Sequence, residues 1–279
     1  MKICPSCNTS MPDEAIFCPT CGKPLVSLTK CPICGHLIPK EYQNSCNSDL
    51  LFEVKGVQFK MKYVEGGSFI MGAQDNDNEA HYWEKPSHWV KIDSFYMSET
   101  QVTQMLWNLV MKEGPFSFKG NANPVESVSI HECNVFIKRL NAITGRKFSL
   151  PTEAQWEYAA RGGNKSKGYI YAGSNQLDKV SWYRDNSDSK THQVATKEPN
   201  ELGLYDMTGN VWEWCNDFYN DNYYSISPQD NPNGPLSGDE YVIRGGCWLN
   251  SPKGCRITSR AHKSPSYFSN IIGFRLVLV

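Results

Sequence analysis

The strongest constraint on the fold of this chain comes from the cysteines near its start. Seven of the eleven cysteines fall within the first 46 residues, and six of these seven form Cys-x-x-Cys pairs. Each such pair is a tight turn that directs two sulfur atoms at one ion, and two pairs complete a tetrahedral site. Because so short a segment has almost no other core, we expect metal binding to fold it. The pattern predicts a zinc module at residues 1–50 and a larger domain at residues 51–279.

The first set of zinc ligands is complete. It consists of Cys4, Cys7, Cys18 and Cys21. Disulfides are the alternative, but the sequence begins directly with the Cys-rich segment and contains no apolar stretch of secretory or membrane-spanning length. We therefore expect a cytoplasmic protein without a membrane span, in which zinc is favoured over disulfides.

The second set of zinc ligands is incomplete. Cys31, Cys34 and Cys46 have the expected spacing, but Asp49 occupies the place of the fourth cysteine. Either Asp49 or His36 completes a weaker site, or the site is empty. The whole segment resembles a double zinc ribbon, a small adaptor module, and this resemblance implies docking onto a protein partner.

Charge patterning argues against a nucleic-acid or membrane-surface partner. The formal net charge is −1, 20% of the residues are charged, and no basic block is present. Lys23, Lys30 and Lys40 make only a thin basic surface on the zinc module, so nucleic-acid binding there is a weaker alternative to a protein partner.

Periodicity predicts that the larger domain mixes strands, helices and long irregular loops. Alternation of apolar and polar residues predicts one strand at 53–63, and further strands are expected at 68–72, 88–92 and 95–97. Helical spacing and capping residues predict helices at 100–112, 129–144 and 150–163. Residues 164–203 are expected to form a long coil anchored by side chains or ions.

Two carboxylates on the last predicted helix have a spacing that suits acid–base chemistry. Glu153 and Glu157 lie four residues apart on one helix face. No histidine lies near them in the sequence, so we expect surface or loop-anchoring carboxylates rather than a catalytic pair.

A turn-rich segment further along the chain is a candidate calcium site. Asn210 and Glu213 lie beside Gly209, whose flexible backbone can direct carbonyl oxygens inward. Oxygen ligands of this kind suit calcium. A buried pair of tryptophans, Trp212 and Trp214, in a turn explains the motif nearly as well.

A series of ordered motifs resembles the formylglycine-generating, sulfatase-modifying family and covers nearly all of residues 56–279. The motifs are GGSFIMG (66–72), EKPSHWVKIDSFYMSETQVT (84–103), NPVESVSI (123–130), RLNAITGRKFSLPTEAQWEYAARGG (139–163), NELGLYDMTGNVWEWCNDFY (200–219), VIRGGCW (242–248) and IIGFRLV (271–277). The resemblance implies an α+β, C-type-lectin-like fold with much irregular loop. It also implies calcium binding near Asn210, Val211 and Glu213.

The cysteines needed for the chemistry of that family are incomplete. The resemblance implies oxidation of a substrate cysteine at a copper ion, which two thiols five residues apart would hold. Cys255 fills the second of these positions, but the first is Asn250, and Cys247 lies too early. A lone thiol cannot make a two-coordinate copper site. We therefore expect Cys255 to be structural and the protein not to be an enzyme.

The C-terminal stretch also resembles the variable regions of target proteins of diversity-generating retroelements, many of which share this fold. In those proteins reverse transcription randomises adenines between fixed frame residues. The frame here would be Arg244, Gly245, Gly246, Trp248, Cys255, Arg256, Arg260, Pro265, Gly273, Phe274 and Arg275. The candidate ligand-binding residues are Trp248, Leu249, Asn250, Ser251, Gly254, Ser259, Ala261, His262, Ser264, Tyr267, Phe268, Ser269, Asn270 and Ile271.

We therefore expect a non-catalytic protein that binds an unknown protein or other macromolecule through residues 244–275. Exposed aromatic side chains on a rigid frame suit such binding, because they give contact area with little loss of entropy. A metalloenzyme resembling formylglycine-generating enzyme, or an invariant scaffold of the same fold, are the alternatives.

Overall fold

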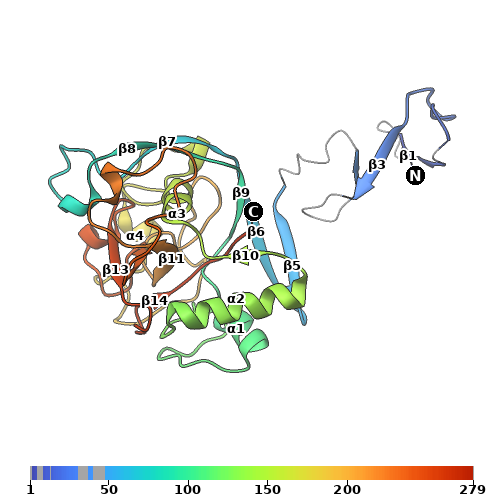
Figure 1. Ribbon diagram of the computed structural model, residues 1–279. Coiled ribbons are helices and arrows are strands. Elements are labelled where there is room, and N and C mark those ends of the chain that lie inside the picture. Colours follow the sequence, from blue (N-terminus) through green and yellow to red (C-terminus); the bar gives the residue numbers. More distant parts are fainter. Residues whose placement is uncertain (1, 5–8, 13, 31–36, 40–47, 279) are drawn as a thin grey trace. The chain divides into compact units, whose positions relative to one another are not determined.

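The chain folds into two compact units, Met1–Leu50 and Leu51–Val279, in the computed structural model of Figure 1. The structure describes residues 2–4, 9–12, 14–30, 37–39 and 48–278. Within these ranges no helix combines the length and the apolar character that a membrane span requires.

The first unit is a small antiparallel sheet with little core. Its strands are β1 (Lys2–Ile3), β2 (Ser10–Met11), β3 (Val26–Lys30) and β4 (Leu37–Pro39), in the order β2-β1-β3-β4. Among its described residues only Cys4, Cys18 and Leu50 are buried.

The described part of the second unit contains three sheets. The first has the order β10-β15-β9-β6-β5 and is made of β5 (Leu50–Val54), β6 (Val57–Val64), β9 (Phe95–Ser98), β10 (Phe148–Ser149) and β15 (Val277–Leu278). The second has the order β13-β12-β11-β14 and is made of β11 (Trp212–Phe218), β12 (Tyr241–Arg244), β13 (Arg260–Lys263) and β14 (Ile272–Gly273). The third is the hairpin of β7 (Gly67–Met71) and β8 (His88–Ile92).

Three of the helices begin directly after capping residues, a few residues inside two of the expected ranges, whereas a fourth lies within the long coil expected at 164–203. The α-helices are α1 (Gln104–Met111), α2 (Ile130–Thr144), α3 (Glu153–Ala160) and α4 (Leu177–Val180), with short 3-10 turns at η2 (Tyr82–Glu84), η3 (Gly163–Lys165), η4 (Tyr223–Ser225) and η5 (Pro252–Cys255). The hydroxyls of Thr103, Ser129 and Thr152 accept hydrogen bonds from the first turns of α1, α2 and α3. These bonds satisfy amides that would otherwise lack partners.

One strand prediction was wrong. The single strand expected at 53–63 is a hairpin of β5 and β6, which turns at Lys55 and Gly56 with positive φ values of 49° and 85°. A two-residue turn of this kind matches the twist of the strands it joins. The apolar–polar alternation continues across such a turn, so the pattern alone hides it.

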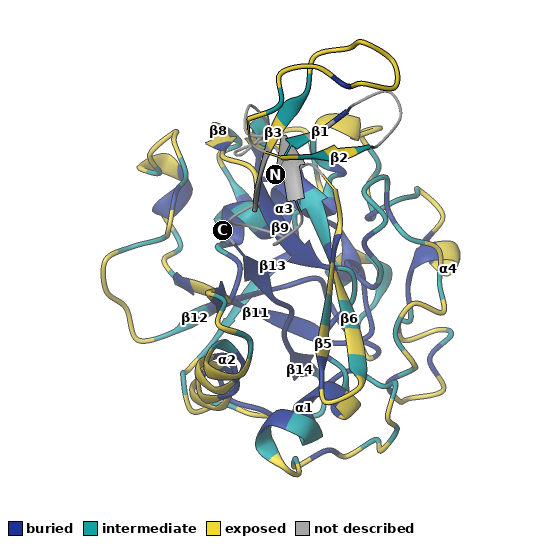
Figure 2. Cartoon of the chain, turned by 90° about the vertical axis from the view of Figure 1, so that its right-hand side faces the viewer, coloured by how far each residue is buried: buried dark blue, intermediate teal, exposed yellow. Residues whose placement is uncertain are grey.

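An aromatic cluster attaches the end of the chain to the helical layer. Trp107 of α1 stacks on Phe136 of α2 with ring centres 5.2 Å apart, and Phe274 meets both rings edge-on. In Figure 2 strand β9 and most of β11 are buried, whereas α2 carries exposed residues along one side. The Gly-Phe-Arg segment is therefore fixed in the core of this unit.

Candidate functional site

Four arginines anchor the C-terminal stretch to the body of the second unit. These frame arginines are Arg244, Arg256, Arg260 and Arg275, and each is at most 5% exposed. Every one of them is neutralised by a glutamate from a distant part of the chain. A buried guanidinium is tolerated only when it is paired and hydrogen-bonded in this way.

Two of the pairs are simple forks. Arg275 donates from Nε and Nη2 to Oε2 and Oε1 of Glu213, at 2.6 and 2.8 Å. Arg256 donates from Nη1 and Nη2 to Oε2 and Oε1 of Glu84, both at 2.9 Å. Two parallel hydrogen bonds fix the relative orientation of the guanidinium and carboxylate planes as well as their separation.

The other two pairs share carboxylates on α3. Arg260 donates from Nε and Nη2 to the two oxygens of Glu153, both at 2.7 Å. Arg244 donates to Glu153 at 2.9 Å and to Glu157 at 2.6 Å. Burial alone would raise the pKa of Glu157, but Arg161 and Arg244 outweigh burial and lower the pKa.

These contacts correct the prediction for the two helix carboxylates. Glu153 and Glu157 are 2% and 0% exposed, so they are not surface groups. They do anchor loops, as the alternative prediction stated. The signal that points to burial is the flanking sequence of α3, where alanine and aromatic residues surround both carboxylates.

The two ends of the stretch attach to the same strand. Strand β12 pairs antiparallel with β11, placing Arg244 opposite Glu213, and β14 pairs parallel with β11, placing Gly273 opposite Glu213. Gly273 is required there, because a Cβ atom would lie 2.1 Å from the carbonyl oxygen of Val125. Residues 248–271, which we call the display stretch, are therefore held at both ends.

The predicted ligand-binding residues differ widely in exposure. Leu249 and Phe268 are 52% and 66% exposed, and Ser264 is also exposed. The residues of intermediate exposure are Asn250, Ser251, Gly254, Ala261, His262, Tyr267, Ser269, Asn270 and Ile271.

Two of the predicted contact residues are buried, and their contact with a ligand stays a prediction. Trp248 is 8% exposed, its Nε1 donates to the carbonyl of Asn270 at 3.0 Å, and its ring meets Phe118 edge-on. Ser259 is 7% exposed. The contacts of Trp248 fix it within the display stretch.

The side chain of Asn250 stabilises the backbone turn that begins at Cys247. Its Oδ1 accepts hydrogen bonds from the backbone nitrogen of Cys247 at 3.0 Å and from the Cys247 thiol at 2.9 Å. The side chain that replaces the first cysteine of the copper motif therefore closes a turn at the start of the display stretch.

Known protein families resemble this chain in both of its units. Residues 53–279 match the model of the sulfatase-modifying factor enzyme 1-like domain, and residues 3–25 match that of a zinc-ribbon domain. The chain belongs to the sulfatase-modifying factor enzyme 1-like family. These matches confirm the predicted family, the α+β C-type-lectin-like fold and the zinc ribbon.

Relatives of this family member include both enzymes and variable proteins. Treponema denticola variable protein 1 is 31% identical and superposes with a TM-score of 0.76, over 82% of this chain and 98% of that protein. Formylglycine-generating enzyme of Streptomyces coelicolor is 38% identical over 76% of this chain and 87% of that enzyme. Serine/threonine-protein kinase pkn1 of Chlamydia caviae is 28% identical over 77% of this chain, which spans only 37% of that kinase.

The two cysteines of this family member that lie near Asn250 are buried. Cys247 and Cys255 are 1% and 0% exposed. Burial raises the pKa of each to about 12, and the nearby Cys247 adds to the effect on Cys255. Because the thiolate is the reactive form, neither residue is an active nucleophile at neutral pH. This finding agrees with a structural role for Cys255.

The oxygens expected to bind calcium already have protein partners. Both oxygens of Glu213 accept from Arg275, and the side-chain nitrogen of Gln101 donates to the Val211 carbonyl and to Glu213, each at 2.9 Å. The side chain of Asn210 bonds the backbone of His192 instead. An arginine beside the carboxylate also repels a divalent cation. The geometry therefore argues against Glu213 and Asn210 as side-chain ligands for calcium.

The zinc module brings three of its predicted ligands together. The sulfur atoms of Cys4, Cys18 and Cys21 lie within 4.8 Å of one another, and no other cluster of three or more His, Cys, Asp or Glu ligands occurs in the described ranges. Cys7, Cys31, Cys34, Cys46 and His36 lie outside the described residues. Asp49 is exposed, and its assignment to a second zinc site stays a prediction.

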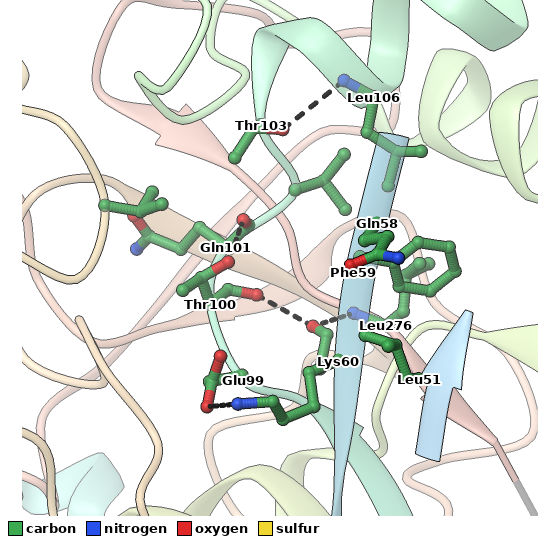
Figure 3. A pocket seen from close by; sticks show the side chains of 13 residues that line it. Leu51, Gln58, Phe59, Lys60, Glu99, Thr100, Gln101, Thr103, Leu106 and Leu276 are labelled. Atoms are coloured by element: carbon green, nitrogen blue, oxygen red, sulfur yellow. Dashed lines mark hydrogen bonds and ion pairs between the residues drawn. The ribbon is translucent and has the colours of Figure 1, made fainter. Parts of the chain in front are cut away.

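A cavity of about 270 Å³ lies away from the display stretch, beside β6 and residues 98–103. Figure 3 shows Lys60 paired with Glu99 at its edge, 3.0 Å apart, and Thr103 capping α1. The described residues that line it include no histidine or cysteine.

Proposed function

We propose that this protein is a non-catalytic binding protein that presents the display stretch as a diversified surface on a C-type-lectin-like scaffold. The observation that carries the proposal is the division between fixed and exposed residues. The frame arginines are buried and ion-paired, whereas Leu249 and Phe268 between them face solvent. Exposed positions of this kind can be exchanged with little change in stability.

The exposed residues suit a macromolecular ligand, most simply a protein. Phe268 and the half-buried Tyr267 present rigid aromatic area, and Leu249 adds an aliphatic contact. Such residues dominate protein recognition because they bury much surface and lose little entropy. The similarity to Treponema denticola variable protein 1 supports the same class.

The DNA beside the gene tests this proposal. We expect a near-copy of the segment that encodes residues 244–275, with asparagine-type codons at the exposed positions, close to a reverse transcriptase gene. Differences between the two copies should fall at adenines of the template and spare the frame arginines. Absence of both the near-copy and the reverse transcriptase would refute diversification.

A metalloenzyme is the second candidate, because one observation favours it. Cys247 lies close enough to Cys255 to raise its pKa, so a second sulfur is available although Asn250 replaces the expected cysteine. Anaerobic Cu(I) titration of the wild type, Cys247→Ala and Cys255→Ala separates the candidates. Equal weak binding by all three supports the binding protein, and tight binding lost in both variants supports the enzyme.

We also propose that Cys4, Cys7, Cys18 and Cys21 hold one Zn²⁺ ion. Four thiolates in tetrahedral array are the usual structural zinc site, and a unit with so little core gains its stability from the metal. We assign this zinc ribbon to docking on a protein partner. A cytoplasmic location, which keeps the thiols reduced, remains a prediction.

A further inference from the structure

A second hollow lies beside the display stretch and shares His262 with it. Its volume is about 460 Å³, and its walls include Tyr82, Trp83, Tyr219, Asp221, Glu240 and His262. We propose that this pocket binds a cationic side chain, the guanidinium or ammonium group of an arginine or lysine on the partner protein. The identity of the partner rests on the proposed function, whereas the affinity of the pocket for a cation does not.

The aromatic wall of the pocket is held in place. The rings of Tyr82 and Trp83 meet edge-on with centres 4.9 Å apart, and His81 stacks on Trp83 at 4.4 Å. Trp83 donates from Nε1 to the carbonyl of Arg260 at 3.3 Å, and Arg260 donates back to the carbonyl of Trp83 at 3.0 Å. Tyr82 is 66% exposed in spite of these contacts. A cation near the face of such rings is attracted by their quadrupole.

Asp221 supplies a negative charge to the pocket, and its two side-chain hydrogen bonds come from phenols. Its Oδ1 accepts from the hydroxyl of Tyr219 at 2.6 Å, and its Oδ2 accepts from the hydroxyl of Tyr82 at 3.1 Å. The bond from Tyr219 lowers the pKa of Asp221, and the bond from Tyr82 adds to this effect, so the carboxylate is ionised at neutral pH. Both donors are neutral phenols, and each oxygen retains a lone pair for a further donor.

Glu240 supplies the second charge. Its Oε2 lies 2.5 Å from Nδ1 of His262, and both side chains are 41% exposed. A neutral imidazole can donate from Nδ1 and leave the charge of Glu240 intact. The ring of His262 stacks on Tyr219 with centres 3.9 Å apart, which fixes this pair against the aromatic wall.

The nearest arginine offsets the charge of Asp221 only in part, because Arg260 lowers the pKa of Asp221 less than the hydrogen bonds from Tyr219 and Tyr82 do. Arg260 lies 4.9 Å from the ring centre of Tyr219, but both of its bonds to Glu153 neutralise it in the core. Because His262 and Arg260 already contact the ring of Tyr219, the groups left to meet a ligand are two carboxylates, the rings of Tyr82 and Trp83, and one imidazole. An anionic ligand would be repelled, and a neutral sugar would gain nothing from the net charge.

Binding of amino acid derivatives tests the proposal on the full chain. The probes are N-acetyl-arginine amide and N-acetyl-lysine amide, and the indole N–H resonance of Trp83 reports binding. We expect Asp221→Asn and Glu240→Gln each to weaken binding about two- to fivefold, since partly exposed ion pairs are modest. Tyr82→Ala should weaken it by a similar factor of about two to five through the lost ring.

Asp239→Asn is the matched control. Asp239 is an exposed neighbour of Glu240 that carries the same charge but is not among the described residues lining the pocket. We expect this variant to bind both probes like the wild type, and N-acetyl-glutamate amide not to bind at all. Thermal unfolding of each variant checks that the fold is unchanged.

Two results would overturn the proposal. One is unchanged binding of both cationic probes in Asp221→Asn and Glu240→Gln. The other is binding of N-acetylglucosamine that matches the cationic probes and depends on Tyr82 but not on Asp221, which would identify a site for neutral sugars. Neither result depends on the DNA beside the gene, so failure of the pocket and failure of diversification are distinguishable.

Discussion

Arg260 and Glu153 form a two-bond ion pair within the second unit, with both donor–acceptor distances at 2.7 Å. The side chains are 1% and 3% exposed, although the residues are 107 positions apart in the chain. This pair connects strand β13, within the display stretch, to helix α3. The display stretch is therefore attached to helix α3 through this ion pair and to the sheet through strand β13.

Glu153→Gln is expected to destabilise the fold strongly. The change leaves Arg260 without its charged partner and leaves Arg244 with Glu157 alone, and breaking one side of a buried pair costs about 3–5 kcal/mol. Urea unfolding measures the loss. Glu99→Gln is the control, because its pair with Lys60 is partly exposed and should contribute at most about 1 kcal/mol. Equal losses in the two variants would contradict the anchoring role of Glu153.

Stability should fall as the pH rises from about 4 to about 8. Burial, with Glu153 nearby, raises the pKa of Asp217 to about 8. An unfolded aspartate has a pKa of about 3.9, so between these values only the folded state holds the proton. The free energy of unfolding then decreases by up to about 1.4 kcal/mol per pH unit. Urea unfolding of Asp217→Asn at several pH values should give a flatter profile, and a slope equal to that of the wild type would refute this assignment.

Substitutions at the exposed positions of the display stretch should be tolerated. Leu249→Ser and Phe268→Ser are each expected to change the free energy of unfolding by no more than about 0.5 kcal/mol. Trp248→Ser should cost about 3–5 kcal/mol, because it removes a buried ring. Thermal and urea unfolding of the three variants make the comparison. If Leu249→Ser or Phe268→Ser lowers the free energy of unfolding nearly as much as Trp248→Ser, the exposed residues are part of the structural frame and not a surface reserved for contact.

Cys247 and Cys255 should resist alkylation in the native protein. Their pKa values of about 12 leave almost no thiolate at pH 7.5, and burial blocks access. Iodoacetamide treatment followed by peptide mass spectrometry should find both unmodified until denaturant is added. Rapid labelling of either cysteine in the native state would favour the metalloenzyme.

Removal of zinc should affect the two units differently. A strong chelator is expected to unfold the unit Met1–Leu50 and leave Leu51–Val279 folded, because the cysteine cluster belongs to the first unit alone. Metal analysis and near-ultraviolet circular dichroism follow the two effects. Cys4→Ser should lose the ion of the first set, whereas Cys133→Ser, in helix α2, should retain it. Retention of zinc by Cys4→Ser would exclude the proposed ligand set.

Local signals in the sequence predicted the helices well. The capping residues Thr103, Ser129 and Thr152 each contact the turn that follows them, so three or four residues determine where a helix starts. The hairpin at Lys55 and Gly56 was missed because its two-residue turn preserves the alternation that predicted one long strand.

The candidate site was predictable only in part. Resemblance identified the frame arginines, but their partners are distant: Arg256 and Glu84 are 172 positions apart, and no local pattern connects them. The display stretch has no helical or strand period, so burial of Trp248 and Ser259 could not be read from it. The pocket beside His262 was missed for the same reason, because Tyr82, Asp221 and Glu240 come from three separate segments.

Strands β12 and β14 lie on either side of β11. This arrangement bears on whether the segment between them can be exchanged between proteins. The points where residues 245–271 leave and rejoin the sheet are two strand spacings apart, or about 10 Å. This separation is set by the backbone hydrogen bonds of the sheet and does not depend on the side chains between. A segment from another protein of this fold should therefore be transplantable between the same two junctions as one cassette.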